Sequence, residues 1–403
     1  MKKFFLDKNW SMYNEKVGVV EAAVPGCVHT DLINCGQIED IYWRDNNDKY
    51  QWIENEDFTY TCVFDAEESE DAVLVFEGLD TYCEIYLNGE HIGSAQNMYI
   101  PHEYKVGGKL KASGNELRVE LRSPIKEVEN MPERRGAFTK ERINTRRMQC
   151  TYSWDWVDRF VTCGIYRPVY IKYGNDMHVD SVYIVTENID EYSAQIRAEI
   201  DLNNCENGGT MQIEVIAPDG EVIANERVYS KEPKVVRRYD IENPELWYPL
   251  GYGEHPIYTY RITLGENLFE DTFGIRTMKI LQLEDKEGSE EEKYCQEIRK
   301  YVAGQIKDHN EKTRGFQIVI NGIKILAFGG NWVPCDPFPS EVTAERYEKL
   351  VEMAAEMNLN MLRVWGGGLF EDRAFFDACD RFGIMVSQDF LILIRLRRWG
   401  MPL

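Results

Sequence analysis

The sequence predicts a mostly β chain that continues into an α/β segment: a jelly-roll sandwich, an immunoglobulin-like sandwich and an incomplete (β/α)8 barrel. Three observations predict this order. Apolar and polar residues alternate over much of residues 1–282, which is the period of half-buried strands. Strand-like and helix-like stretches alternate from residue 316 onwards, as in parallel βαβ units. Large aromatic residues follow predicted strand ends on glycine-rich backbone, as in Arg363–Gly368, which suits the active-site rim of a barrel.

Residues 1–174 are predicted to form the jelly-roll sandwich. Ala72–Phe76 is a continuous apolar run and is expected to be a buried strand. Cys83, Ile85 and Leu87 alternate with their neighbours and lead to Asn88-Gly89, a strong signal for a type I′ hairpin turn. Many short strands between turn signals, with few helical stretches, favour an antiparallel jelly roll.

Residues 175–282 are predicted to form an immunoglobulin-like sandwich. Ala194, Ile196, Ala198 and Ile200 share one strand face, and Pro218–Gly220 turns the chain. About 100 residues with about seven such strands is the usual size of this fold.

Residues 283–315 are predicted to be a linker with one short helix. Residues 284–293 are nearly all charged or small, which indicates solvated chain. Tyr294, Ile298 and Tyr301 then follow at helical spacing.

Residues 316–403 are predicted to begin a barrel. A strand over Ile325–Phe328 is expected to lead into Gly329–Trp332, and a helix is expected to start near Thr343. A second strand ends at Trp365, and a further one starts at Gly383. This segment has 403 − 316 + 1 = 88 residues, whereas a whole barrel takes about 250. The sequence therefore predicts that most of the barrel is missing.

The composition restricts the partners of the protein. Lys plus Arg number 46 against 69 Asp plus Glu, a formal net charge of −23. Such a surface repels nucleic acid and anionic lipid and suits an enzyme with a neutral substrate, although a need for solubility explains the charge equally well. No apolar stretch is long enough to cross a bilayer, so neither nucleic acid nor a membrane is an expected partner.

The cysteine and histidine patterns indicate the compartment and argue against a metal. The ten cysteines are scattered without a C-x-x-C pair, as expected of free thiols in a reducing compartment. The apolar run after Met1 is too short for a secretory signal, so a cytoplasmic location is expected. The six histidines show no metal-ligand spacing, and we predict no metal or cofactor.

A series of short motifs runs from near residue 10 to Phe390. The motifs are Val24-Pro25-Gly26 with His29–Leu32, Phe76–Asp80, Tyr152–Trp156, Gly164–Val169, Phe273–Arg276, Gly330–Pro334 with Asp336, Arg363–Gly368 and Gln388-Asp389-Phe390. Together they resemble glycoside hydrolase family 2, and within it the β-mannosidases. The resemblance implies a jelly roll, an immunoglobulin-like sandwich and a catalytic barrel. It implies retaining, exo-acting hydrolysis of terminal non-reducing β-D-mannose without a cofactor. Two alternatives stay open: another exo-glycosidase of the family, such as an exo-β-glucosaminidase, and a non-catalytic carbohydrate-binding or assembly protein.

The resemblance also implies two catalytic glutamates on later barrel strands, the first of them after an asparagine. The Asn-Glu pairs of this chain all precede the barrel segment: Asn14-Glu15, Asn55-Glu56, Asn115-Glu116, Asn225-Glu226 and Asn310-Glu311. We therefore assign no catalytic residue, and we expect the chain alone to be inactive. Leu391–Trp399 is apolar and then basic, unlike the family, which suggests a frameshift or a premature stop, or a divergent terminus.

Five residues are candidates for binding a β-mannoside or a manno-oligosaccharide. Asp389, at a predicted strand end, could accept hydrogen bonds from sugar hydroxyls, but capping of a following helix explains it as well. Trp365 suits the apolar face of a pyranose, or else the barrel core. Asp155 and Trp156 lie in a segment that resembles the family's jelly-roll loop at the active site. Asn331 is a weaker candidate, because loop ordering would also explain it.

An incomplete parallel barrel leaves strand edges uncovered, and such edges pair with other chains. The sequence therefore predicts that residues 316–403 are either less ordered than the sandwiches or covered at the open barrel edge by a partner, such as a second copy in a homo-oligomer.

Overall fold

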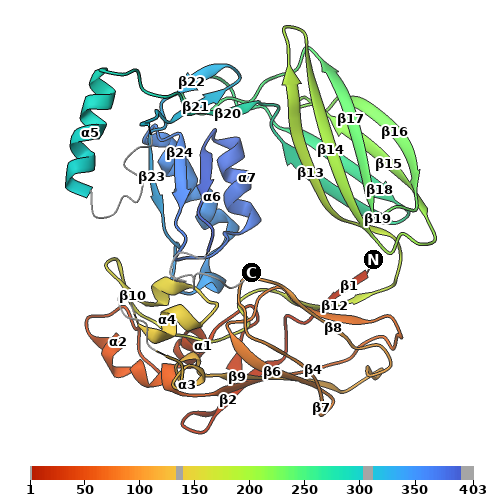
Figure 1. Cartoon of the computed structure of the whole chain (residues 1–403). Coiled ribbons are helices and arrows are strands. Elements are labelled where there is room, and N and C mark those ends of the chain that lie inside the picture. Colours follow the sequence, from red (N-terminus) through yellow and green to blue (C-terminus); the bar gives the residue numbers. More distant parts are fainter. Residues whose placement is uncertain (1, 133–138, 303–311, 392–403) are drawn as a thin grey trace.

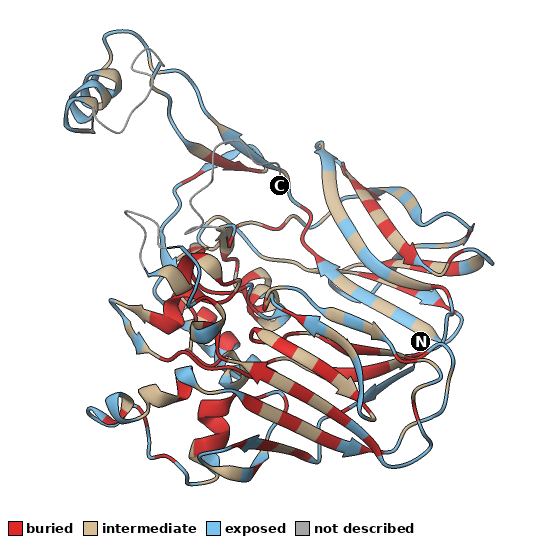
Figure 2. Ribbon diagram, turned by 60° about the horizontal axis from the view of Figure 1, so that its bottom comes forward, coloured by how far each residue is buried: buried red, intermediate tan, exposed pale blue. Residues whose placement is uncertain are grey.

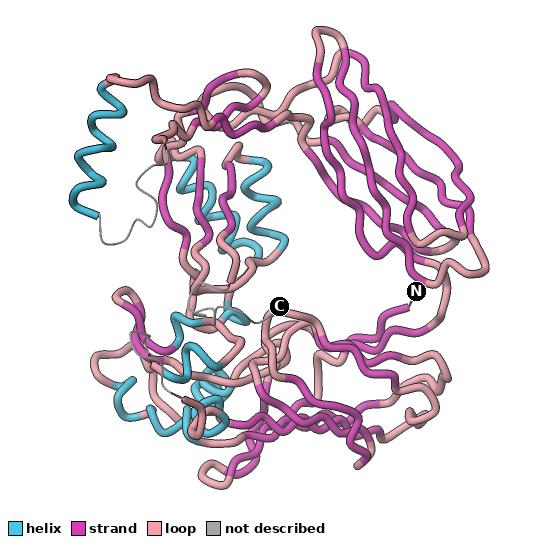
Figure 3. The backbone as a smooth tube through the Cα atoms, in the orientation of Figure 1, coloured by secondary structure: helices cyan, strands magenta, loops and turns pink. Residues whose placement is uncertain are grey.

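The structure is a computed structural model that describes residues 2–132, 139–302 and 312–391. The chain forms two β-sandwiches and a smaller unit of parallel strands and helices, which lies above the N-terminal sandwich and to the left of the second one in Figures 1 and 3. The chain is mostly β, as the sequence predicts. Of the predicted Leu391–Trp399 stretch, residues 392–399 lie outside the described residues.

The N-terminal sandwich pairs a six-stranded sheet with a four-stranded one. The first has the order β3 (Gly18–Ala22), β2 (Trp10–Asn14), β4 (Phe58–Phe64), β9 (Asn115–Arg122), β6 (Tyr82–Leu87) and β7 (Glu90–Ala95). The second has the order β1 (Lys2–Phe5), β12 (Val169–Tyr173), β5 (Val73–Phe76) and β8 (His102–Lys105). All neighbours are antiparallel.

The alternation in the sequence places one face of these strands in the core. Buried residues alternate with intermediate or exposed ones along β4 and β9, and Figure 2 shows this as banding of the strands. The predicted strand over Ala72–Phe76 and the hairpin at Asn88-Gly89 are confirmed. Both turn residues have positive φ, 54° and 83°, as a type I′ turn requires.

Short helices cover one end of this sandwich. They are α1 (Val28–Asn34), α2 (Asn46–Lys49), η1 (Gln51–Asn55), α3 (Pro124–Glu127), α4 (Lys140–Asn144) and η2 (Gln149–Thr151). The buried Asp31 of α1 accepts hydrogen bonds from the Tyr60 hydroxyl at 2.5 Å and from the Ala23 amide at 2.9 Å. Burial raises the pKa of the Asp31 carboxyl from its ordinary 3.8 to about 6, although these hydrogen bonds oppose the change.

This buried carboxyl is expected to make stability depend on pH. Folding favours its protonated form, so its contribution is complete below pH 3.8 and is lost as the pH rises through about 6. That difference in pKa is worth about 3 kcal/mol. We expect Asp31→Asn to weaken the pH dependence of stability. Between about pH 4 and pH 7, the free energy of unfolding of the variant should fall less than that of the unaltered chain. Urea unfolding across this range measures both proteins, and parallel profiles would contradict the assignment.

The second sandwich pairs a three-stranded with a four-stranded antiparallel sheet. The strand orders are β13 (His178–Ile189), β14 (Ser193–Asn203), β17 (Lys234–Glu242), and β16 (Val222–Ser230), β15 (Gly209–Ile216), β18 (Tyr258–Leu264), β19 (Asn267–Phe273). The face predicted from Ala194, Ile196, Ala198 and Ile200 is buried and packs against Met211, Ile213 and Val215 of the other sheet.

A small antiparallel sheet and one helix join this sandwich to the parallel unit. The sheet has the order β20 (Met278–Leu281), β21 (Gln317–Ile320) and β22 (Ile323–Ile325). Helix α5 (Glu290–Val302) confirms the predicted helical spacing, and it stands apart from both sandwiches (Figures 1 and 2).

The last unit is a three-stranded parallel sheet with two helices. Its strands are β23 (Gly329–Trp332), β24 (Met361–Val364) and β25 (Met385–Gln388), and its helices are α6 (Ala344–Glu356) and α7 (Arg373–Arg381); the 3-10 turn η3 (Pro339–Glu341) precedes α6. Thr343 caps α6 as expected, since its hydroxyl accepts from the Arg346 amide. The predicted strand over Ile325–Phe328 is wrong: β22 ends at Ile325, and the parallel strand starts at Gly329.

Glycine explains this displacement of the strand. A Cβ at Gly329 would overlap the carbonyl group of Met361 on β24, so only glycine allows the two strands to pair here. Asn331 therefore lies within a strand rather than in the loop beyond one.

Both sandwiches hold the parallel unit. In the first, the Arg167 guanidinium donates to the carbonyl of Phe370 at 2.9 Å. In the second, the Trp247 indole donates to the carbonyl of Asp380 at 2.9 Å, and the Leu250 amide donates to that of Gly383 at 2.8 Å.

All ten cysteines are free thiols, and seven of them are buried. None of the described helices is both long and apolar enough to span a membrane.

Candidate functional site

The carboxyl ends of the three parallel strands place polar side chains side by side. The strands pair in register, so Asn331 of β23 lies beside Arg363 of β24, and Arg363 lies beside Ser387 of β25. Leu362 and Val364 are buried, which leaves Arg363 on the opposite face of the strand. This edge of the sheet points toward the end of the jelly roll that carries α4 and the β10 strand (Figure 1).

Asp389 joins the three strands at this edge. Its amide donates to the carbonyl of Val364 at 3.0 Å. Its carboxylate accepts from Arg363 Nε at 3.2 Å and Nη2 at 2.6 Å, and from the Gly366 amide at 3.2 Å. Nη1 of Arg363 donates to Oδ1 of Asn331 at 3.0 Å. The two-point ion pair holds the carboxylate in one orientation at the rim of the sheet.

Trp365 lies directly after β24 and contacts two indoles of the jelly roll. The ring centroid of Trp154 is 4.8 Å from that of Trp365, and the centroid of Trp156 is 6.1 Å away at an interplanar angle of 81°. Both belong to a hairpin of β10 (Tyr152–Trp154) and β11 (Val157–Arg159). We call this hairpin, Tyr152–Arg159, the aromatic hairpin. Asp155 and Trp156 form its two-residue turn, and both are exposed.

The glycines after Trp365 are needed for close packing. A Cβ at Gly367 would overlap the six-membered ring of Trp365, and one at Gly368 would lie 2.6 Å from Cγ of Pro334. The carbonyl of Gly367 accepts from the Gln149 and Cys150 amides at 2.9 and 3.1 Å, so jelly-roll backbone bonds directly to this loop.

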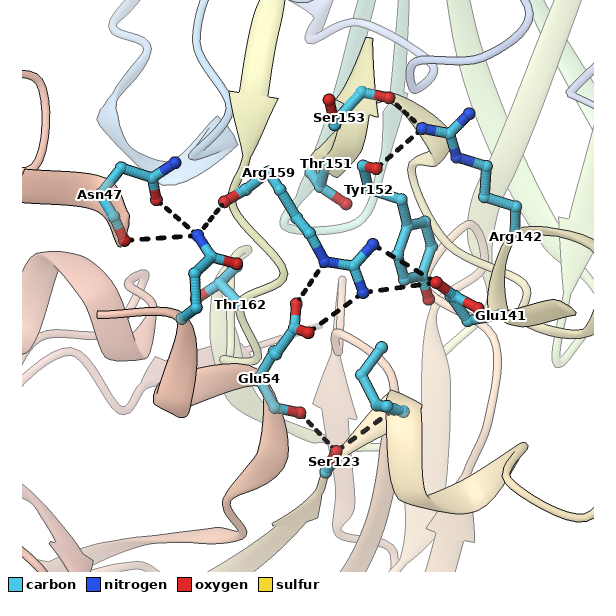
Figure 4. A network of polar contacts seen from close by, with 12 residues as sticks. Asn47, Glu54, Ser123, Glu141, Arg142, Thr151, Tyr152, Ser153, Arg159 and Thr162 are labelled. Atoms are coloured by element: carbon cyan, nitrogen blue, oxygen red, sulfur yellow. Dashed lines mark hydrogen bonds and ion pairs between the residues drawn. The ribbon is translucent and has the colours of Figure 1, made fainter. Parts of the chain in front are cut away.

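A polar network fixes the aromatic hairpin on the jelly roll (Figure 4). On β11, Arg159 donates to both carboxylate oxygens of Glu54, at 2.7 and 3.1 Å, and to Glu141 at 3.3 Å. On the β10 side, Arg142 of α4 donates to the carbonyls of Tyr152, at 2.7 Å, and Ser153. The hairpin is therefore held from both strands.

A buried acid, Glu371, ties the loop between β24 and α7 to strand β23 and helix α6. The Glu371 carboxylate accepts from the Trp332 indole at 2.9 Å and from the Tyr347 hydroxyl at 2.6 Å. Burial raises the pKa of Glu371, although the hydrogen bonds from Tyr347 and Trp332 oppose the rise. No group of three or more His, Cys, Asp or Glu side chains within residues 2–132, 139–302 and 312–391 is arranged to hold a metal ion.

The structure brings four of the five candidate residues together in two pairs, one joined through a shared partner and one in direct contact. Asn331 and Asp389 meet through Arg363, and Trp156 meets Trp365. Asp155 lies beside Trp156 in the hairpin turn. Sequence reasoning missed Arg363 and Trp154 as site residues, although both stand inside motifs that it identified. The alternation Leu362, Arg363, Val364 is the signal that could have placed Arg363 on the face opposite the buried residues.

Comparisons with known proteins decide the family. Residues 10–167 match the family model for the glycosyl hydrolase 2 galactose-binding domain-like domain, and residues 177–276 match that for glycosyl hydrolases family 2. The chain belongs to glycoside hydrolase family 2. It is 31% identical to beta-mannosidase B of Thermothelomyces thermophilus over 96% of this chain and 45% of that protein. It is 30% identical to the beta-mannosidase of Capra hircus, again over 96% of this chain and 45% of that protein.

One solved beta-mannosidase structure agrees with this assignment, and a second solved structure shares the fold. The crystal structure of the beta-D-mannosidase from Dictyoglomus thermophilum superposes with a TM-score of 0.84 at 33% identity, over 97% of this chain and 47% of that chain. Beta-glucuronidase 3 of Bacteroides uniformis shares the fold alone, with a TM-score of 0.63 at 14% identity over 96% of this chain and 45% of that chain. The family-2 chain described here spans about half the length of the curated relatives it matches.

Proposed function

We propose that this family-2 chain forms the N-terminal part of an exo-β-mannosidase, which releases terminal non-reducing β-D-mannose with retention of configuration. The observation that carries this proposal is the similarity to beta-mannosidases along nearly the whole chain, at 31% identity over 96% of its length. The ordered carboxylate at the edge of the parallel strands supports it, because an uncharged sugar is bound through hydrogen bonds to its hydroxyls.

In this proposal, different residues of the site contact different parts of the sugar. Asp389 accepts hydrogen bonds from sugar hydroxyls while Arg363 holds its carboxylate in one orientation. Asn331 extends the same polar edge through Arg363. Trp365 and Trp156 supply flat apolar faces for the pyranose, and Asp155 reaches the sugar from the hairpin turn.

The strands β23, β24 and β25 are, in this proposal, the start of a (β/α)8 barrel, which follows the jelly roll of residues 1–174, the immunoglobulin-like sandwich of 175–282 and the linker of 283–315. A retaining glycosidase needs two carboxyl groups about 5–5.5 Å apart, one as acid/base and one as nucleophile. We place both on later barrel strands of the complete enzyme. The 403-residue chain then contributes a sugar-binding surface without the catalytic pair.

Binding of simple glycosides tests the proposal. Calorimetric titration with the methyl β-glycosides of mannose, glucose and N-acetylglucosamine is expected to show a preference for the mannoside, with a Kd of about 1 mM because only part of the site is present. Asp389→Asn is expected to weaken this binding about 10- to 100-fold, the usual cost of losing hydrogen bonds to a charged group.

The matched control is Asp190→Asn, which alters an aspartate that orders a turn of the second sandwich. It is expected to leave the affinity unchanged. A preference for the glucosaminide would favour an exo-β-glucosaminidase. Equal binding of all three sugars, with no effect of Asp389→Asn, would exclude the proposed site.

The cellular setting is part of the same proposal. We place the enzyme in the cytoplasm, which the ten free cysteines support, since thiols persist in a reducing compartment. The outer edges of β23 and β25 have no neighbour within the described sheet. We propose that either the remaining barrel strands or a second copy of the chain covers them.

A further inference from the structure

We infer that Arg159 is a positioning residue for the sugar site. Its bonds to Glu54 and Glu141 set the position of the aromatic hairpin relative to Trp365. This inference rests on the proposed function for the identity of the sugar, but its geometric part is independent of any ligand.

The aromatic hairpin is too small to hold its own position. Each strand has three residues, with the pairs Tyr152–Arg159 and Trp154–Val157, and at the base the Phe160 amide donates to the Thr151 carbonyl at 2.8 Å. A hairpin of this size is marginally stable at best in water. Its orientation therefore depends on contacts with the body of the jelly roll.

Arg159 supplies the contacts at the end of β11. Glu54 belongs to η1 and Glu141 to α4, so one guanidinium joins the hairpin to two separate elements (Figure 4). The Arg159 carbonyl also accepts from Gln51 Nε2 at 3.0 Å. The planar fork of arginine matches two carboxylates at once, which a lysine ammonium on a flexible stem does not do.

The other side of the hairpin is held at the backbone and at a ring. Arg142 bonds to the carbonyls of Tyr152 and Ser153, and its guanidinium carbon lies 5.1 Å from the ring centroid of Trp154. Arg142 holds the β10 side and Arg159 holds the β11 side. A change at Arg159 releases only the β11 side, so the hairpin tilts about its Arg142 contacts. The rings at the opposite end, Trp154 and Trp156, then move relative to Trp365.

The anchor is partly open to solvent, so it can be altered without opening the core. Side-chain exposure is 26% for Arg159 and 14% for both Glu54 and Glu141. By contrast, the ion pair of Arg147 and Asp80 beneath the same segment is buried, and changing it would destabilise the whole sandwich. Arg159 is therefore the position at which the orientation of the hairpin can be separated from folding.

The experiment compares Arg159→Gln with Arg237→Gln. Arg237 makes a similar two-point ion pair with Glu226 in the second sandwich, away from the site. The first readout is far-ultraviolet circular dichroism, in which closely spaced indoles give a coupled signal; loss of this signal in Trp154→Phe assigns it to the Trp154–Trp365 pair. The second readout is the affinity for methyl β-D-mannoside, and the third is the melting temperature.

Arg159→Gln is expected to remove most of the coupled signal and to weaken mannoside binding up to about tenfold, the scale of losing one aromatic contact. Its melting temperature is expected to stay close to that of Arg237→Gln, which keeps both the signal and the affinity. An unchanged signal and affinity in Arg159→Gln would overturn the inference and leave Arg159 a purely structural residue.

Arg159→Lys covers the case in which the glutamine variant does not fold. Lysine keeps the charge but not the bridge, so a folded lysine variant with a reduced coupled signal supports the inference, and an unchanged signal overturns it. If the unaltered chain binds no mannoside while the signal still depends on Arg159, the proposed function fails and the positioning role stands.

Discussion

The purified 403-residue polypeptide is expected to leave 4-nitrophenyl β-D-mannopyranoside unhydrolysed, at a rate indistinguishable from that of buffer. Glycoside hydrolysis with retention needs a nucleophile and an acid/base about 5–5.5 Å apart. At the described sheet edge, the Asp389 carboxylate is bound by Arg363 and Gly366. We propose that the catalytic pair lies on later barrel strands of the complete enzyme. Since enzymes accelerate their reactions by about 10⁶-fold or more, a missing pair is easily distinguished from a weak one.

A spiked sample controls this assay. An active β-mannosidase added at known amount shows that the substrate and conditions report turnover. Hydrolysis that copurifies with the chain, and that disappears in Asp389→Asn, would show that the chain has its own catalytic centre and would refute the proposal.

Replacing Arg147 by methionine is expected to destabilise the N-terminal sandwich by about 3–5 kcal/mol. The Arg147 side chain is fully buried, and it bonds to Asp80 through Nε at 2.8 Å and Nη2 at 2.7 Å. It also donates to the Thr151 hydroxyl and to the Thr162 carbonyl, each at 3.0 Å. Methionine fills much of the volume but leaves the Asp80 carboxylate in the interior without its cationic partner, since among the residues that the structure describes only the hydrogen bond from the Thr81 hydroxyl remains on its side chain. Urea unfolding followed by tryptophan fluorescence measures the loss.

Two further variants isolate the cause. Adding Asp80→Asn to Arg147→Met removes the unpaired charge and is expected to recover part of the stability, so the two changes should be far from additive. Lys172→Met breaks an ion pair with the half-exposed Glu103 and is expected to cost less than about 1 kcal/mol. A cost of this small size for Arg147→Met itself would contradict the assigned role.

Local sequence patterns were enough to predict the two sandwiches. The alternation in Cys83, Ile85 and Leu87 and the Asn88-Gly89 turn depend on neighbouring residues only, and the structure confirms both. The parallel strand at Gly329–Trp332 was not predictable in this way. Its apolar neighbours Leu326 and Phe328 look more strand-like, yet they are 75% and 57% exposed. What selects the strand is the close approach of Gly329 to Met361, a contact between distant parts of the chain.

In the candidate site, too, local patterns identify some of the residues, whereas contacts between distant parts of the chain could not be predicted. Asp389 and Trp365 were identified because strand ends and glycine-rich turns are visible in the sequence. That Arg363 bonds to both Asn331 and Asp389 depends on the register of three parallel strands, which only the folded sheet defines. That Trp154 meets Trp365 depends on the docking of the jelly roll on the parallel unit, between residues far apart in sequence.

A crystal structure of this chain with methyl β-D-mannopyranoside tests the central claim most directly. The account predicts a sugar whose hydroxyls lie about 2.6–3.2 Å from the Asp389 carboxylate and whose ring rests against Trp365, with no second carboxyl group across the glycosidic bond. A mannoside bound elsewhere on the molecule, or one held between two facing carboxyl groups about 5–5.5 Å apart, would contradict it.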